Sequence, residues 1–148
     1  MYQLCTFALV TFCLVFGVHG ALEPVEVANK TYTIKTTTKQ SWFKAEQLCN
    51  LDGLTLATIT SADDNDNLSD ALDTAGVSSG EFWIGGTDNA LTGDWYWLGS
   101  GVPVVYNEWI KGKPGNANKN DHCMSLVDYS WTVSNCEKKL FYICQNQC

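Results

Sequence analysis

The cysteines constrain this chain more than any other feature of its sequence. Seven cysteines occur in 148 residues, and two of them, Cys5 and Cys13, lie in the first twenty. The other five are Cys49, Cys123, Cys136, Cys144 and Cys148. In an exported domain of this size cysteines pair by default, because the compartment is oxidising. Since five is odd, one thiol stays free or pairs with another chain, and spacing alone does not select the pairs.

The start of the chain predicts export. Residues 1–20 contain no charged side chain and include a long apolar stretch, which is typical of a secretory signal peptide. Val18 and Gly20 place small residues at positions −3 and −1 of a cleavage site before Ala21. The alternative is a membrane anchor, but a span needs about 20 continuous apolar residues. We therefore expect a secreted, extracellular domain at residues 21–148, with no membrane insertion.

Composition and charge exclude several function classes. The chain is 45% hydrophobic and 12% aromatic, which is too apolar for a disordered protein. It has 9 basic and 16 acidic residues, so its formal net charge is −7. Nucleic acids and other polyanions are disfavoured as partners, because they bind through Lys and Arg. A zinc site is also disfavoured, since residues 21–148 contain no C-x-x-C pair and only one histidine, His122.

Residue patterns predict an α+β fold with helices early and strands late. Residues 31–38 are rich in β-branched side chains and should form a strand. Apolar residues at helical spacing predict one helix over 41–48. A second helix should begin at Ser61, with Asp64 completing an acidic variant of a capping box. Short aromatic or branched runs predict further strands at 82–86, 94–98, 102–106, 123–127 and 141–144.

The segment between Trp109 and Cys123 has no periodicity and is rich in Gly, Asn and Lys. A long irregular loop inside a compact domain commonly carries function. We therefore expect this loop to have a function or to be mobile.

Over about residues 32–144 the chain resembles the C-type lectin-like domain family. Its motifs occur in the family's order, beginning at Ser41 (S-W-x-x-A-x-x-x-C), Trp83 (W-I-G-G), Gly101 (G-x-x-x-x-Y-x-x-W) and Cys123 (C-x12-C). Cysteine 144 near the end completes the pattern. As a small secreted single domain, the chain is most similar to invertebrate members of the family.

The resemblance implies a C-type lectin-like fold, in which two helices pack on antiparallel sheets that disulfides staple together. It pairs Cys49 with Cys144 and Cys123 with Cys136. In the chain-entropy model, the disulfide that closes the longer loop stabilises the fold by about 4–5 kcal/mol, and the one that closes the shorter loop by about 3 kcal/mol. This pairing leaves Cys148 over. We expect Cys148 to form an interchain bridge, giving a disulfide-linked dimer, and a small-thiol cap is the alternative.

In sugar-binding members of the family, a calcium ion held by the long loop and an adjoining strand binds the sugar hydroxyls. The family supplies oxygen ligands from a Glu-Pro-Asn or Gln-Pro-Asp triplet, an acidic residue before the next cysteine, and a Trp-Asn-Asp triplet. The resemblance assigns this degenerate sugar site to Lys113, Pro114, Gly115, Asp121, Thr132 and Val133. Of the ligand positions only Asp121 keeps a carboxylate, and the ammonium of Lys113 would repel a cation. We therefore expect no bound metal and no cofactor.

An accessory calcium position of the family is altered as well. Asp88 matches an acidic ligand there, whereas Thr92 and His122 replace two others. The asparagines that follow Gly115 are interpreted as loop-forming residues, since no carboxylates surround them.

Two functions from different classes follow. The first is a secreted binding protein of innate-immune type that recognises glycans weakly or without calcium. Aromatic stacking would then supply affinity, and Trp109 and Trp131 are the nearest candidates, although core packing is the favoured interpretation of both. The alternative is a salivary or venom-like antagonist that binds a protein, such as a haemostasis factor. An ice-binding or mineral-associated role ranks third.

An enzyme is not expected, because His122 precedes a cysteine that the resemblance commits to a disulfide. The chain also lacks the G-x-S-x-G and H-E-x-x-H motifs. Two sequons, at Asn29 and Asn67, predict N-glycosylation.

Overall fold

The computed structural model describes residues 30–114 and 120–146. The predicted signal peptide, Asn29, Gly115 and Cys148 therefore lie outside the described residues. The helices are α1 (Trp42–Leu51) and α2 (Ala62–Thr74). The strands are β1 (Tyr32–Gln40), β2 (Leu54–Leu56), β3 (Glu81–Thr87), β4 (Tyr96–Trp97), β5 (Asp121–Val127), β6 (Ser130–Asn135) and β7 (Leu140–Asn146).

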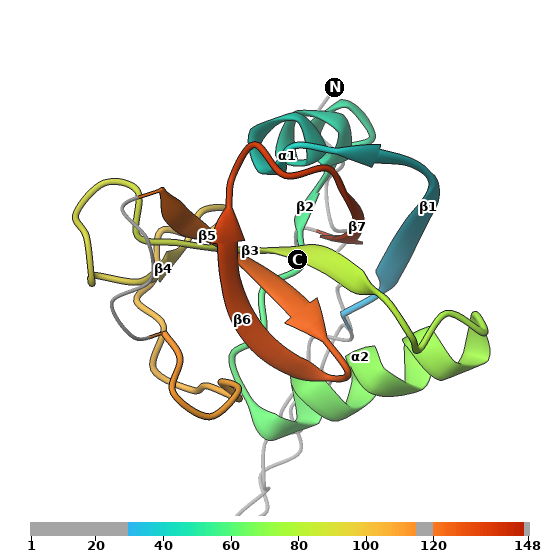
Figure 1. Ribbon diagram of the computed structural model, residues 1–148. Helices are drawn as coiled ribbons and strands as arrows, with labels where there is room; N and C mark the ends of the chain where they lie inside the picture. The colour runs from blue at the N-terminus through green and yellow to red at the C-terminus, as the bar shows by residue number, and fades with distance from the viewer. Residues whose placement is uncertain (1–29, 115–119, 147–148) are drawn as a thin grey trace, which may run out of the picture.

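Helix α1 packs on one side of the sheet, and α2 lies on the other (Figure 1). The buried stripe of α1 consists of Trp42, Ala45 and Cys49, which join a core cluster with Trp83 and Tyr142. The indole of Trp42 donates to a backbone carbonyl of β3 at 2.8 Å, so this buried polar group is satisfied. The predicted helix is confirmed, and it extends three residues beyond the predicted end.

Helix α2 begins where its capping residues predict. The Ser61 hydroxyl accepts a hydrogen bond from the Asp64 backbone N–H at 3.1 Å. The Asp64 carboxylate in turn accepts hydrogen bonds from the backbone N–H and the hydroxyl of Thr60 and forms an ion pair with Lys30. Leucines of this helix enter a second core cluster that also contains Ile84 and Trp131. The domain thus has a core on each side of the sheet.

The strands form one seven-stranded sheet with the order β1-β7-β3-β5-β6, in which β2 pairs with β7 and β4 pairs with β3. All of these pairs are antiparallel except β3–β7, which is parallel. The expectation of purely antiparallel sheets is therefore corrected to one mixed sheet. The pattern of apolar residues in a strand indicates which face of the strand is buried. It does not indicate whether the adjacent strand runs parallel or antiparallel.

One predicted strand is absent from the structure. Residues 102–106 form no strand, and only Pro103 makes an isolated bridge, to Tyr96. The pairing on either side of Pro103 consists of two backbone hydrogen bonds, from Trp97 to Val102 and from Val104 to Trp95, and extends no further. In contrast, β6 had not been predicted. Its residues alternate between polar side chains and the buried Trp131 and Val133, so the strand pattern was present in the sequence.

The structure contains the two disulfides that the resemblance implies, Cys49–Cys144 and Cys123–Cys136. The first joins α1 to β7, and the second joins β5 to the turn after β6. Packing explains the second glycine of the W-I-G-G motif, Gly86, because a Cβ atom at this position would lie 2.2 Å from the Met124 sulfur.

Candidate ligand-binding site

Residues 88–114, called here the loop region, leave the sheet at the end of β3 and contain only the short strand β4. Backbone hydrogen bonds hold this region on the sheet. The N–H of Leu98 donates to the carbonyl of Gly85 at 2.9 Å. Trp131 in β6 donates its N–H to Glu108 at 2.7 Å and accepts from the N–H of Ile110 at 2.8 Å. The loop region is therefore docked on two strands that lie far apart in the sequence.

An aromatic cluster fills the space under the loop region. The fully buried ring of Trp131 makes edge contacts with Trp97, Tyr106 and Trp109 at centroid distances of 5.4, 5.8 and 5.6 Å. Trp109 is half-buried against the same core and also contacts Trp95. The interpretation of Trp131 as a core residue is confirmed. These rings stabilise the loop region, and Trp131 offers no surface on which a sugar could stack.

Two of the residues assigned to the sugar site lie at the end of the loop region. Lys113 and Pro114 are half-buried, and the peptide bond between them is cis. The N–H of Lys113 donates to the carbonyl of Ile110 at 2.9 Å, which closes a turn just before the pair. The third residue of this triplet, Gly115, lies outside the described residues.

The strand positions of the sugar site lie on β5 and β6. Asp121 begins β5 and is half-buried, opposite Asn135 of β6. Thr132 and Val133 are consecutive residues of β6, and Val133 is buried beside Met124. A buried valine side chain offers a cation no oxygen ligand. Within residues 30–114 and 120–146, no group of three or more His, Cys, Asp and Glu side chains could hold a metal ion.

The accessory calcium position is occupied by an internal contact. The buried Asp88 carboxylate lies 2.8 Å from Nδ1 of His122 through one oxygen and accepts the N–H of Gly93 at 2.6 Å through the other. The Thr87 hydroxyl donates to the carbonyl of His122 at 2.6 Å. These bonds join the start of the loop region to β5. Both oxygens of the acid that the resemblance assigns to calcium are thus engaged by the protein itself.

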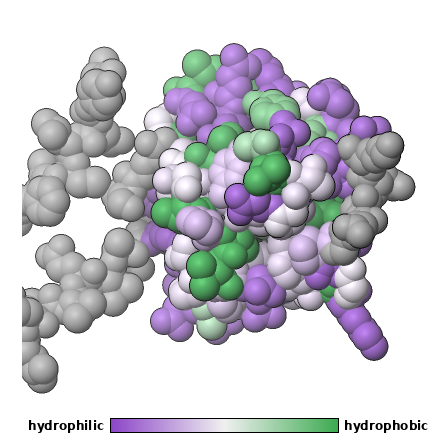
Figure 2. All heavy atoms as spheres, turned by 90° about the vertical axis from the view of Figure 1, so that its left-hand side faces the viewer, coloured by the Kyte–Doolittle hydropathy of each residue, from purple (hydrophilic) through white to green (hydrophobic). Residues whose placement is uncertain are grey.

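The outer surface of the loop region includes several exposed apolar side chains. Figure 2 views the molecule from this side and shows hydrophobic areas among hydrophilic ones. Five large apolar side chains of this region are exposed: Leu91, Leu98, Val102, Val105 and Ile110. The most exposed are Val105 at 84% and Leu91 at 66%. Exposed apolar side chains of this kind can contribute to a contact site for another macromolecule.

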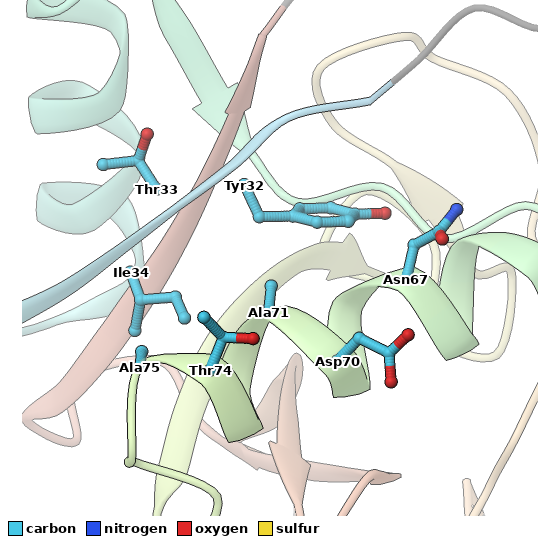
Figure 3. Close-up of a pocket in the computed structure, with 8 residues that line it drawn as sticks. All are labelled: Tyr32, Thr33, Ile34, Asn67, Asp70, Ala71, Thr74 and Ala75. Atoms are coloured by element: carbon cyan, nitrogen blue, oxygen red, sulfur yellow. The ribbon is translucent and has the colours of Figure 1, made fainter.

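The predicted glycosylation site at Asn67 lies on the exposed face of α2. It borders a cavity of about 600 Å³ between β1 and α2 (Figure 3). Tyr32 lies across this cavity, and its hydroxyl donates to the backbone carbonyl of Asp64 at 3.2 Å. Burial and the negative charge of Asp64 raise the pKa of Tyr32, so its hydroxyl stays protonated and keeps this hydrogen bond. Glycosylation of Asn67 remains a prediction.

Comparison with known proteins identifies the family. Residues 38–146 match the family model described as "Lectin C-type domain". The chain belongs to the C-type lectin family. The fold agrees, because the mouse scavenger receptor C-type lectin carbohydrate-recognition domain superposes with a TM-score of 0.70 at 25% identity, over 80% of this chain and 91% of that one.

Two sequence relatives come from insects. Lectin subunit alpha of Sarcophaga peregrina is 27% identical over 147 residues, which are 92% of this chain and 52% of the relative. This C-type lectin therefore spans about half the length of that relative. Salivary C-type lectin 1 of Aedes albopictus is 28% identical over 115 residues, covering 71% of this chain and 75% of the relative.

Proposed function

We propose that this C-type lectin is a secreted recognition protein whose loop region binds its ligand without calcium. One observation carries the proposal. Among the described sugar-site positions, only Asp121 has a carboxylate, and Val133 is buried hydrocarbon. Calcium takes six to eight oxygen ligands, so a single carboxylate is far too few. The ammonium of Lys113 adds repulsion at the same edge.

The exposed apolar side chains of the loop region favour an extracellular protein as the ligand. The free energy of binding becomes more favourable when another apolar surface covers aliphatic groups such as Val105 and Leu91. They offer little to sugar hydroxyls, and the buried Trp131 cannot stack on a sugar ring. An insect relative that is named a salivary lectin fits a secreted antagonist of this kind.

A glycan bound weakly and without calcium is the second candidate, and membership of a lectin family favours it. We propose no catalytic activity, because the relatives are named lectins and Cys123, which follows His122, is in a disulfide. Among the residues that the structure describes, no helix is long and apolar enough to cross a membrane.

Calcium titration calorimetry tests the proposal. We expect no specific heat of binding at millimolar calcium, since the oxygen ligands are missing. A dissociation constant below about 1 mM that Asp121→Ala abolishes would overturn it. The combined variant Lys113→Glu, Gly115→Asn, Thr132→Asn and Val133→Asp restores the oxygens and should create calcium binding, which controls for an intact frame.

A glycan array read with calcium and with EDTA separates the two ligand classes. An array of neutral glycans that is blank in both buffers supports a protein ligand, whereas neutral-glycan hits that persist in EDTA support a glycan. Hits that disappear in EDTA would contradict calcium independence altogether.

A further inference from the structure

A second pocket lies at the opposite end of β3 from the loop region. The loop region leaves β3 after Thr87, whereas this pocket, called here the lysine pocket, surrounds the strand's first residues, Glu81 and Phe82. It is a cavity of about 650 Å³, which is within the range of small-ligand sites. The surrounding segments are β1, the turn after α2, the start of β3 and the start of β7.

Three of the nine basic residues of this acidic chain line the lysine pocket: Lys39, Lys138 and Lys139. The only acidic residue in its lining is Glu81. The Glu81 carboxylate is already engaged, because it accepts from Lys138 at 2.5 Å and from two serine hydroxyls at 2.9 Å each. Within the described part of the chain, neither Lys39 nor Lys139 forms an ion pair. The pocket therefore carries net positive charge.

The wall of the lysine pocket is aromatic and apolar. Phe82 and Phe141 both line it, with ring centroids 6.2 Å apart. The ammonium of Lys39 lies 5.1 Å from the centre of the Phe141 ring, a cation–π contact that holds this charge at the pocket. Thr36 and Ser79 add hydroxyl groups to the lining. A ligand here would meet positive charge, hydrogen-bonding hydroxyls and an apolar face together.

We propose that the lysine pocket binds an acidic saccharide, that is, a sugar ring that carries a sulfate or a carboxylate. The anionic group would bind the ammonium groups of Lys39 and Lys139, which form no ion pair among the described residues, and the C–H face of the sugar ring would pack beside Lys39 on the Phe141 ring. Lysine is a common partner of such oxyanions.

The overall charge of −7 does not prevent this binding. The Debye length is about 8 Å at physiological ionic strength, so distant carboxylates are screened while the lysines lining the pocket act directly. A long polyanion would still meet the acidic surface elsewhere, and the proposal is accordingly for a short ligand.

A titration followed by ¹H–¹⁵N NMR tests the proposal on the secreted chain, with EDTA present throughout. The probes are N-acetylglucosamine 6-sulfate, glucuronic acid, neutral N-acetylglucosamine and inorganic sulfate. We expect at least one acidic sugar to shift the amides of Lys39, Ser79 and Lys139. Lys39→Gln and Lys139→Gln should each weaken that binding about threefold, and together about tenfold, since each removes one solvent-exposed charge contact.

The matched control is Lys44→Gln, which removes an exposed lysine of α1 whose ammonium contacts Gln47 outside the pocket. It should leave the affinity unchanged. Binding of the neutral sugar or of bare sulfate as tight as that of the acidic sugars would overturn the proposal, and so would the absence of shifts at the pocket. The lysine pocket shares no residue with the loop region, so this outcome is independent of the calcium titration.

Discussion

At the scale of single residues, Trp131 contributes strongly to the packing of the loop region on the sheet. Its ring is fully buried among other aromatic rings, and its backbone pairs with Glu108 and Ile110. The next two residues, Thr132 and Val133, lack the oxygens of sugar-binding family members. The packing role of this segment is therefore independent of calcium coordination.

Replacing Trp131 tests this role. Trp131→Ala should lower the free energy of unfolding by about 3–5 kcal/mol, because it removes a large buried side chain and leaves a cavity. Urea unfolding measures the loss, and hydrogen exchange should show faster exchange in the loop region. The exposed control Leu91→Ala should change stability by less than about 0.5 kcal/mol. A loss below about 1 kcal/mol in Trp131→Ala would contradict the packing role.

At the scale of secondary-structure elements, Glu81 connects β3 to its neighbours. Its carboxylate accepts hydrogen bonds from Ser125 of β5, Ser134 of β6 and Lys138 of the turn before β7. Burial alone would raise the pKa of Glu81, but the hydrogen bonds from Lys138, Ser125 and Ser134 outweigh it and hold this pKa below the usual 4.5. The ionised carboxylate is thus the form that stabilises the sheet.

This lowered pKa predicts a loss of stability in acid. Because the folded-state pKa lies below the unfolded one, the contribution of Glu81 is fully present above about pH 4.5 and is lost as the pH falls through the folded-state value. Glu81→Gln removes this contribution. Urea unfolding between about pH 7 and about pH 3 should therefore show a smaller acid-side decrease in the variant than in the wild type.

The capping residue Asp64 also has a lowered pKa, for which burial acts upward and the hydrogen bonds from Lys30 and Thr60 prevail. Because Asp64 is present in both the wild type and Glu81→Gln, the stability of both proteins should still decrease as the pH falls. Identical slopes for the wild type and Glu81→Gln would show that Glu81 does not contribute.

At the scale of the whole molecule, the two disulfides connect segments that are far apart in the chain. Cys49–Cys144 joins residues separated by 95 positions, and Cys123–Cys136 closes the hairpin of β5 and β6. Cys148 is left over from this pairing and lies outside the described residues. In an oxidising compartment a leftover thiol becomes oxidised.

We predict that Cys148 forms an intermolecular bridge, giving a homodimer or a heterodimer with another secreted lectin-like chain. Non-reducing electrophoresis of the secreted protein should show a dimer that reduction and Cys148→Ser both abolish. A single monomer band with a small-thiol adduct on Cys148 would rule the dimer out. A dimer that persists in Cys148→Ser would assign the bridge to another cysteine.

Features encoded by neighbouring residues were predictable from the sequence. The start of α2 follows from Ser61, since its hydroxyl caps the Asp64 N–H within one helical turn, whereas the Asp64 carboxylate binds Thr60 and not the Ser61 N–H of a full capping box. The disulfide pairs join distant residues, and it was the resemblance to the family, not a local pattern, that implied them. The family motifs also indicated the lectin fold, because their spacing reflects one topology.

Features built from distant residues required the tertiary structure. The parallel pairing of β3 with β7, the contact between Asp88 and His122, and the lysine pocket formed by Lys39 and Lys139 all join segments far apart in the chain. No local pattern specifies such partners, because they are set by which strands become neighbours when the two cores close on either side of the sheet.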